Sequence, residues 1–98
     1  MPTAFDIQHQ PEHGRFEIAL DGHRGVLRYV PGAGGDGGAR IVIPSVQVDP
    51  AIEGRGVAAA LTRAALDWAR SEGLRVDPVC PYVDAWLRRH PDYDDLRD

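Results

Sequence analysis

The sequence contains no lysine, and all eleven of its positively charged residues are arginine. Schiff-base catalysis needs a lysine amine, and the phosphate-binding loop of the P-loop proteins needs a lysine after its glycines, so both are excluded. Positive charge is also in the minority, because the formal net charge is −4. Nucleic-acid-binding domains are usually basic, and we therefore expect no nucleic-acid partner.

Cysteine occurs only once, as Cys80, so no disulfide can form within the chain. No window approaches the ~20 apolar residues of a membrane span, and the first residues lack the basic and apolar segments of a signal peptide. We expect a soluble cytoplasmic protein in a reducing compartment, with no membrane partner. Its 98 residues are enough for a single domain, residues 1–98, with a modest core.

Strands are predicted at residues 5–10, 15–20 and 24–30, and in the second of them apolar residues alternate with other residues. The Asp-Gly pair at residues 21–22 predicts a tight hairpin between the second and third. Residues 31–39 contain five glycines in nine positions. They lead into another strand and not into a helix, so we interpret them as a flexible connection and not as a phosphate-binding loop.

The fourth strand, residues 40–48, carries an irregularity in its apolar pattern. Ile41 and Ile43 are odd-numbered, whereas Val46 and Val48 are even-numbered. An extra residue near positions 44–45 would keep all four side chains on one face, which predicts a β-bulge. The alternative is two short strands joined by a bend.

A helix is predicted from residue 57 onwards, because an apolar stripe recurs at helical spacing and Gly73 follows as a stop signal. A short strand at residues 74–76 and a second helix at residues 81–89 come next, and Tyr93 and Leu96 are expected to dock the acidic tail. The order is β-β-β-β-α-β-α, an α/β (α+β) fold with a mixed sheet. The fourth and fifth strands should be parallel neighbours.

The stretch from residue 46 to residue 68 is a strand, a turn and a helix start, with Gly54 and Gly56 in the turn. Such glycines let backbone N–H groups approach a ligand, and the helix dipole favours negative charge there. We interpret the stretch as a site for an anion such as a pyrophosphate, with Arg55 as a counter-charge. The alternative is a turn without a ligand. Because ligands of open sheets lie beyond the carboxyl ends of the strands, residues 53–58 and Cys80 should face one cleft.

Three groups of residues resemble the GNAT-type N-acetyltransferases. Residues 53–58, Glu-Gly-Arg-Gly-Val-Ala, resemble their acetyl-CoA loop, Gln/Arg-x-x-Gly-x-Gly/Ala, and the bulged strand resembles their splayed fourth strand. The runs at residues 78–83 and 89–93 are similar to those of an unusually short branch. The resemblance covers residues 5–96 and implies a GNAT-like fold that transfers acetyl from acetyl-CoA to a small amine or a protein amino group.

The resemblance also implies roles for particular residues. Backbone groups of the fourth strand would meet the acetyl carbonyl and the pantetheine arm of CoA, and the loop would hold its pyrophosphate. The cofactor-binding residues implied are Val46, Val48, Glu53, Gly54, Arg55, Gly56, Val57 and Ala58.

Cys80 corresponds to the cysteine proposed as catalytic in this branch. It precedes Pro81 and is expected at the start of the second helix, where the dipole favours a thiolate that could accept the acetyl group or a proton. Tyr82 could protonate the leaving thiolate. The alternatives are a buried thiol without a role and a tyrosine that only packs. His90 is expected to end the helix with a local hydrogen bond.

Two positions depart from the family pattern. Glu53 stands where Gln or Arg is usual, and we expect it to serve as an acid in the first turn of the helix. Ser45 stands where related short proteins often have histidine, and serine cannot act as a base near neutral pH. Two rival functions follow: an acyl-CoA-binding module with little or no catalysis, and an interaction domain that keeps the fold without the cofactor.

Overall fold

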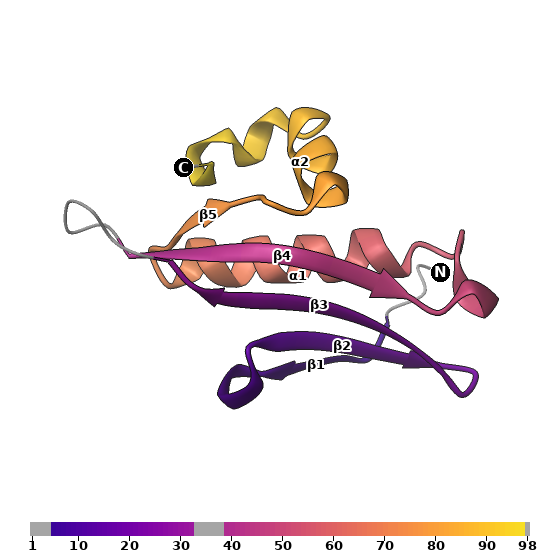
Figure 1. Cartoon of the computed structure of the whole chain (residues 1–98). Helices are drawn as coiled ribbons and strands as arrows, with labels where there is room; N and C mark the ends of the chain where they lie inside the picture. Colours follow the sequence, from indigo (N-terminus) through magenta and orange to yellow (C-terminus); the bar gives the residue numbers. More distant parts are fainter. Residues whose placement is uncertain (1–4, 33–38, 98) are drawn as a thin grey trace.

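The computed structural model describes residues 5–32 and 39–97, which form a five-stranded mixed sheet and two α-helices (Figure 1). The strands lie in chain order across the sheet as β1 (Ile7–Gln10), β2 (Arg15–Leu20), β3 (His23–Pro31), β4 (Arg40–Val48) and β5 (Arg75–Asp77). The α-helices are α1 (Val57–Ser71) and α2 (Pro81–Arg88), and the 3-10 helices are η1 (Pro11–His13), η2 (Pro50–Ile52) and η3 (Pro91–Leu96). The predicted order and α+β class are confirmed.

The first four strands pair antiparallel with their neighbours in sequence, whereas β5 pairs parallel to β4. The β2–β3 hairpin turns at Asp21 and Gly22, whose φ angles of 52° and 77° are those that a two-residue hairpin favours. The glycine-rich connection between β3 and β4 was predicted to be flexible, but residues 33–38 lie outside the described residues.

The predicted bulge in β4 is confirmed by its pairing with β3. Arg28 lies opposite Ser45, and Val30 lies opposite Val42, so two steps along β3 match three steps along β4. The extra residue falls at positions 43–44, one residue earlier than expected. It restores the apolar phase, because buried residues before the bulge and half-buried Val46 after it all pack on the core side.

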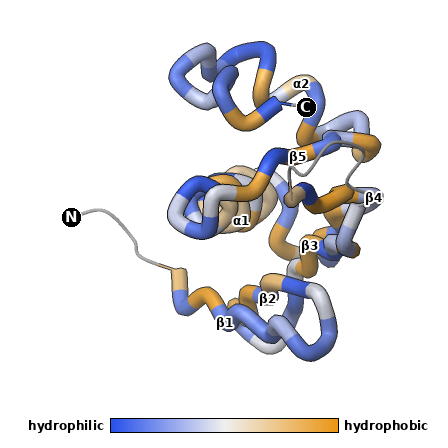
Figure 2. Tube along the Cα trace, turned by 90° about the vertical axis from the view of Figure 1, so that its left-hand side faces the viewer, coloured by the Kyte–Doolittle hydropathy of each residue, from blue (hydrophilic) through white to orange (hydrophobic). Residues whose placement is uncertain are grey.

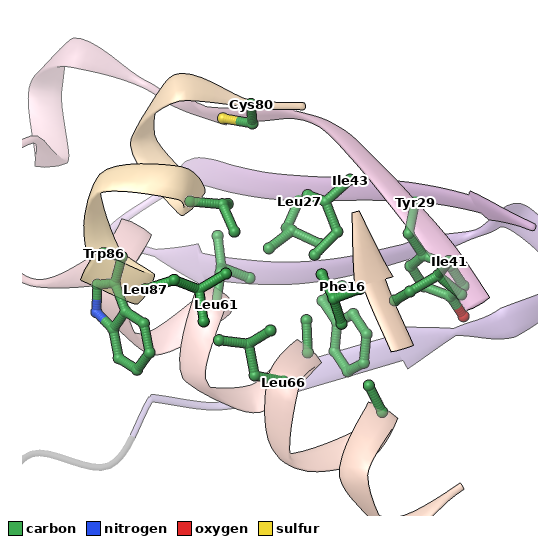
Figure 3. Close-up of a cluster of buried hydrophobic side chains, with 14 of the residues drawn as sticks. Phe16, Leu27, Tyr29, Ile41, Ile43, Leu61, Leu66, Cys80, Trp86 and Leu87 are labelled. Carbon is green, nitrogen blue, oxygen red and sulfur yellow. The ribbon is translucent and has the colours of Figure 1, made fainter. Parts of the chain in front are cut away.

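Helix α1 packs on one face of the sheet (Figure 2). Helix α2 lies at the end of the sheet formed by β4 and β5. Gly25 on β3 permits close contact with α1, because a Cβ atom there would lie 2.6 Å from Cγ1 of Val57. The core between helix and sheet includes Phe16, Leu27, Ile41, Ile43, Leu61 and Leu66 (Figure 3). Burying these side chains is the main source of stability for a chain of this size.

The C-terminal segments close the core at the β5 end of the sheet. The Leu74 N–H donates to the Ala69 carbonyl at 2.8 Å and ends α1 in a Schellman arrangement, with Gly73 at the stop position as predicted. Tyr93 and Leu96 of η3 are both buried, so they dock the tail as expected. Among residues 5–32 and 39–97, neither helix has the length and apolar character needed to cross a membrane.

Candidate functional site

A hollow of about 490 Å³ lies where the end of β4 meets the start of α1. We call it the helix-mouth hollow. Its lining residues come from β4, from the loop and first turn of α1, and from α2: Val46, Val48, Ile52, Glu53, Gly54, Gly56, Val57, Ala58, Ala59 and Tyr82. The structure therefore brings together seven of the eight residues predicted to bind cofactor and one of the two predicted to be catalytic.

The loop before α1 depends on two glycines in left-handed conformations. Gly54 and Gly56 have φ angles of 81° and 84°, which side-chain-bearing residues rarely adopt. A Cβ atom at either position would meet no atom within 4 Å, so the space beside both residues is open. The conformation explains the glycines, and the open space leaves room for a ligand against the backbone.

Asp49 fixes the other end of this loop. Its carboxylate accepts hydrogen bonds from the Ala51 N–H at 3.0 Å and from Nδ1 of His23 at 2.9 Å. These bonds, that of Ala51 first, hold the pKa of the Asp49 carboxyl below its usual value. The link joins η2 to β3 and positions the loop in front of α1.

The start of α1 faces the helix-mouth hollow without a capping side chain. Gly56 is the N-cap residue, and the first turn of this fully described helix contains no acidic residue. The expectation that Glu53 serves as an acid in that turn is therefore wrong. Glu53 lies four residues before Val57 and ends η2, where its exposed side chain lines the hollow. The first N–H groups of α1 have no partner within the helix, and the dipole makes them a favourable place for an anion.

The backbone of β4 supplies a second set of polar groups. The Asp49 N–H donates to the Arg24 carbonyl at 2.9 Å, so alternate residues back to Ser45 turn their backbone groups toward β3. Val46 and Val48 must then turn theirs toward the opposite edge. On that edge β5 pairs with β4 as far as Val42. Within the described chain, one further hydrogen bond follows, from the Cys80 N–H to the Ile43 carbonyl at 2.8 Å. Beyond that point the strands separate beside the hollow.

Tyr82 reaches the hollow from the first turn of α2. Its ring is half-buried and lines the hollow opposite the loop. Desolvation raises the pKa of its hydroxyl, although the charge of Arg89 opposes the shift. The phenol therefore stays protonated at neutral pH and can donate a hydrogen bond or a proton.

Cys80 is the N-cap residue of α2, as predicted from the Cys-Pro pair. Its residue is only 5% exposed, and it belongs to the hydrophobic core and not to the lining of the hollow (Figure 3). The predicted common cleft thus includes the first turn of α2 through Tyr82. The Cys80 thiol itself lies behind that surface.

Three other predicted positions have local roles. Arg55 forms an ion pair with Asp21 at 2.9 Å, and it does not line the hollow. Ser45 precedes Val46, so strand alternation places its side chain on the sheet face away from α1. His90 donates a hydrogen bond from Nδ1 to the Trp86 carbonyl at 2.7 Å and stacks on the Trp86 ring, as expected of a helix-ending residue.

Ile52 and Ala59 line the hollow but were not predicted. Ala59 is the third residue of α1, so helix geometry alone would have placed its N–H beside those of Val57 and Ala58. Ile52 is fully buried under the loop. Its single apolar side chain in a turn gives no sequence pattern, and only the packing of η2 reveals it.

The family model described as GCN5-related N-acetyl-transferase matches residues 15–96. Protein NATD1 of Mus musculus is 32% identical over 88 residues, which make up 87% of this chain and 76% of that protein. Protein NATD1 of Bos taurus is 33% identical over 88 residues, with 87% and 74% covered. A crystal structure of a Trypanosoma brucei acetyltransferase has 22% identity and a TM-score of 0.49, covering 88% of this chain and 63% of that chain. That last likeness is too distant to inform the site.

Proposed function

Since the chain belongs to the GCN5-related N-acetyltransferase family, we propose that it binds acetyl-CoA in the helix-mouth hollow and transfers the acetyl group to an amine. One observation carries this proposal. The hollow joins an uncapped helix start to a strand edge that, among the described residues, has no neighbouring strand. It therefore offers donors for phosphates and backbone partners for an extended chain.

The residues fit the parts of acetyl-CoA in sequence. Backbone N–H groups from Gly54 to Ala58 would hold the pyrophosphate, and Gly56 leaves its approach open. The edge of β4 at Val46 and Val48 would pair with the amides of the pantetheine arm as a further strand would. The Glu53 carboxylate is exposed and is expected to turn toward solvent.

In the transfer step, the amine nitrogen forms a bond to the acetyl carbon while the carbon–sulfur bond of the thioester breaks. The nitrogen loses a proton to solvent, and the departing CoA thiolate gains one. We assign that second proton transfer to the Tyr82 hydroxyl, which lines the hollow and whose pKa is raised by desolvation.

Cys80 remains a proposed catalytic residue with two possible tasks. Its thiol could accept the acetyl group, or it could take part in proton transfer beside Tyr82. Covalent transfer predicts that the intact mass of the parent protein rises by one acetyl group with acetyl-CoA, while that of Cys80→Ala does not. Because the Cys80 residue is only 5% exposed, we expect neither protein to gain an acetyl group. A gain confined to the parent would instead establish the acyl-cysteine route.

Calorimetry with acetyl-CoA, followed by a thiol-release assay with mixed amines, tests the proposal. We expect binding and turnover. Binding without turnover would support the rival acyl-CoA-binding module, which the serine at position 45 and the buried Cys80 favour. An absence of binding at high micromolar acetyl-CoA would contradict both functions and leave an interaction domain.

A further inference from the structure

The sheet face opposite α1 carries a concentration of positive charge that the overall composition does not predict. Strand alternation places Arg15 of β2 and both Arg24 and Arg28 of β3 on this face. Among residues 5–32 and 39–97, no helix lies over this face (Figure 2). Both β3 arginines are exposed. The whole chain nevertheless has a net charge of −4. Glu17 and Asp49 lie on the same face and offset part of this charge, but the three arginines outnumber the two carboxylates. The excess of positive charge suggests a negatively charged partner.

The arginines are unequally neutralised. Glu17 lies between Arg15 and Arg24, at 3.8 Å and 3.4 Å, and forms an ion pair with each. Arg28 lies directly opposite Arg15 in the strand register, and like charges in that arrangement repel each other. Among the described residues, no ion pair or hydrogen bond involves the side chain of Arg28. An acidic ligand would relieve this repulsion.

A shallow groove of about 630 Å³ runs along this face, and we call it the open-face groove. It is lined by Gly22, His23, Arg24, Val26, Arg28, Gln47, Val48, Asp49 and Pro50. Arg24 and Arg28 are four residues apart on one strand, so their Cα atoms are about 13 Å apart. Val26 lies between them, and Gln47 lies beside Val26 on β4. The groove therefore suits an extended chain with two acidic side chains more than a single small molecule.

The open-face groove and the helix-mouth hollow meet at β4. Val48 lines both of them, from opposite faces of the sheet. Ser45 lies directly opposite Arg28, beside the bulge where β4 and β5 separate. A chain in the groove can thus place its end next to an acyl group held along the β4 edge.

We propose that the open-face groove binds the acetyl acceptor, and that this acceptor is the N-terminal amine of a peptide with acidic side chains. The inference rests on the proposed function and adds the class of acceptor. Arg28 has two effects in it. It pairs with a carboxylate of the peptide, and its charge disfavours the protonated form of a nearby amine.

The chemistry of the amine agrees with this assignment. Ser45 offers no base, so the acceptor must lose its proton to solvent before it attacks. A peptide α-amine has a pKa of about 7.7–8.0, whereas that of a lysine side chain is about 10.4. Near neutral pH the α-amine is therefore neutral far more often, and the positive charge of Arg28 increases that fraction. The nitrogen then bonds to the acetyl carbon as the carbon–sulfur bond breaks.

A matched set of peptides tests the proposal with the full chain and acetyl-CoA in a thiol-release assay. The first peptide has a free N-terminus and two glutamates spaced as Arg24 and Arg28 are. The others replace the glutamates by glutamine, replace them by lysine, or block the N-terminus. We expect the acidic peptide to have the highest kcat/KM, the blocked peptide to be inactive, and the rate to rise with pH toward 8.

Arg28→Gln should lower kcat/KM for the acidic peptide about three- to tenfold. It should lower that for the glutamine peptide less, because only the effect of Arg28 on the amine is lost there. Arg88→Gln is the control, because it removes the same charge at a position outside the groove. Arg88 lies on α2 and forms an ion pair with Asp84. Chemical shifts in the apo protein should move along β3 and β4 when the acidic peptide is added.

Three results would overturn the proposal: faster turnover of the lysine peptide, equal effects of the two arginine variants, or peptide-induced shifts away from β3 and β4. If acetyl-CoA binds by calorimetry while any of these holds, only the acceptor assignment fails. If acetyl-CoA does not bind, the proposed function fails and the acceptor assignment with it.

Discussion

The two α-helices begin in similar ways, but their first turns have different surroundings. Both N-cap residues, Gly56 for α1 and Cys80 for α2, lack a side-chain hydrogen bond to the helix. The first turn of α1 has no acid and opens into the helix-mouth hollow. The first turn of α2 contains Pro81 and Asp84, and the Cys80 N–H is bonded to β4.

The difference separates two ways of using a helix start. In α1 the backbone N–H groups remain available, so the helix offers a positive dipole to an anion. In α2 the dipole is already balanced by Asp84, and the turn contributes a side chain, Tyr82, to the hollow. We therefore assign binding to α1 and proton transfer to α2.

The largest effect is expected from giving α1 the acid that α2 already has. Ala59→Glu places a carboxylate at the third helical position, where it satisfies the free N–H groups and repels phosphates. We expect the affinity for acetyl-CoA in calorimetry to fall about 30-fold, or about 2 kcal/mol, while the melting temperature stays equal or rises. Ala59→Gln is the control, because glutamine has nearly the size of glutamate without its charge. Its affinity for acetyl-CoA should fall much less. Similar losses in both variants would mean that bulk and not charge decides.

A smaller effect, on kcat and not on acetyl-CoA affinity, is expected from a change in the first turn of α2. Tyr82→Phe removes the proposed proton donor but keeps the ring, so kcat should fall about tenfold with little change in acetyl-CoA affinity. The activity of the parent protein should not fall through deprotonation of Tyr82 below pH 10, because the pKa of its hydroxyl is raised above the usual 10.0. Stopped-flow or thiol-release measurements across pH provide the check. An unchanged kcat would show that Tyr82 only packs.

The smallest effects concern the aspartates that support the two helix starts. The Arg97 guanidinium holds the pKa of Asp84 below its usual value, and hydrogen bonds to Ala51 and His23 do so for Asp49. Both therefore contribute stability above the ordinary carboxyl pKa of 3.8, and it is lost as the pH falls through their lowered values.

Neutral variants should separate the two aspartates. Asp49→Asn should weaken acetyl-CoA binding about threefold, because it loosens the loop before α1, and Asp84→Asn should not. In both variants the free energy of unfolding should fall less steeply with decreasing pH than in the parent protein. Acid unfolding monitored by circular dichroism provides the measurement. A loss of acetyl-CoA affinity in Asp84→Asn alone would reverse the assignment of the two helix starts.

Local patterns in the sequence were sufficient for most of the fold. Alternation and the Asp-Gly pair placed the β2–β3 hairpin, and the shift in apolar phase between Ile43 and Val46 located the bulge to within one residue. The Cys-Pro pair placed the start of α2. Each of these features depends on a few neighbouring residues, so the sequence contains the whole signal.

Features that join distant segments were not predictable in this way. The ion pair of Arg55 with Asp21 spans 34 positions, and the hydrogen bond between Asp49 and His23 spans 26. Burial of Cys80 depends on how closely α2 packs against β4, and the charge of the open face appears only when β2 and β3 are paired. No spacing rule relates such residues, because their proximity is set by packing of the sheet.

Gly25 on β3 does not line the helix-mouth hollow, but it lies against Val48 and Val57, which do. It leaves space where a methyl group would meet Val57, the first residue of α1. Any side chain at this position would push the first turn of α1 away from the sheet. The N–H groups of that turn would then tilt away from the β4 edge. Acetyl-CoA binding at the proposed site would thus change without any change in a residue that lines the hollow. A survey of ligand contacts alone would miss this position.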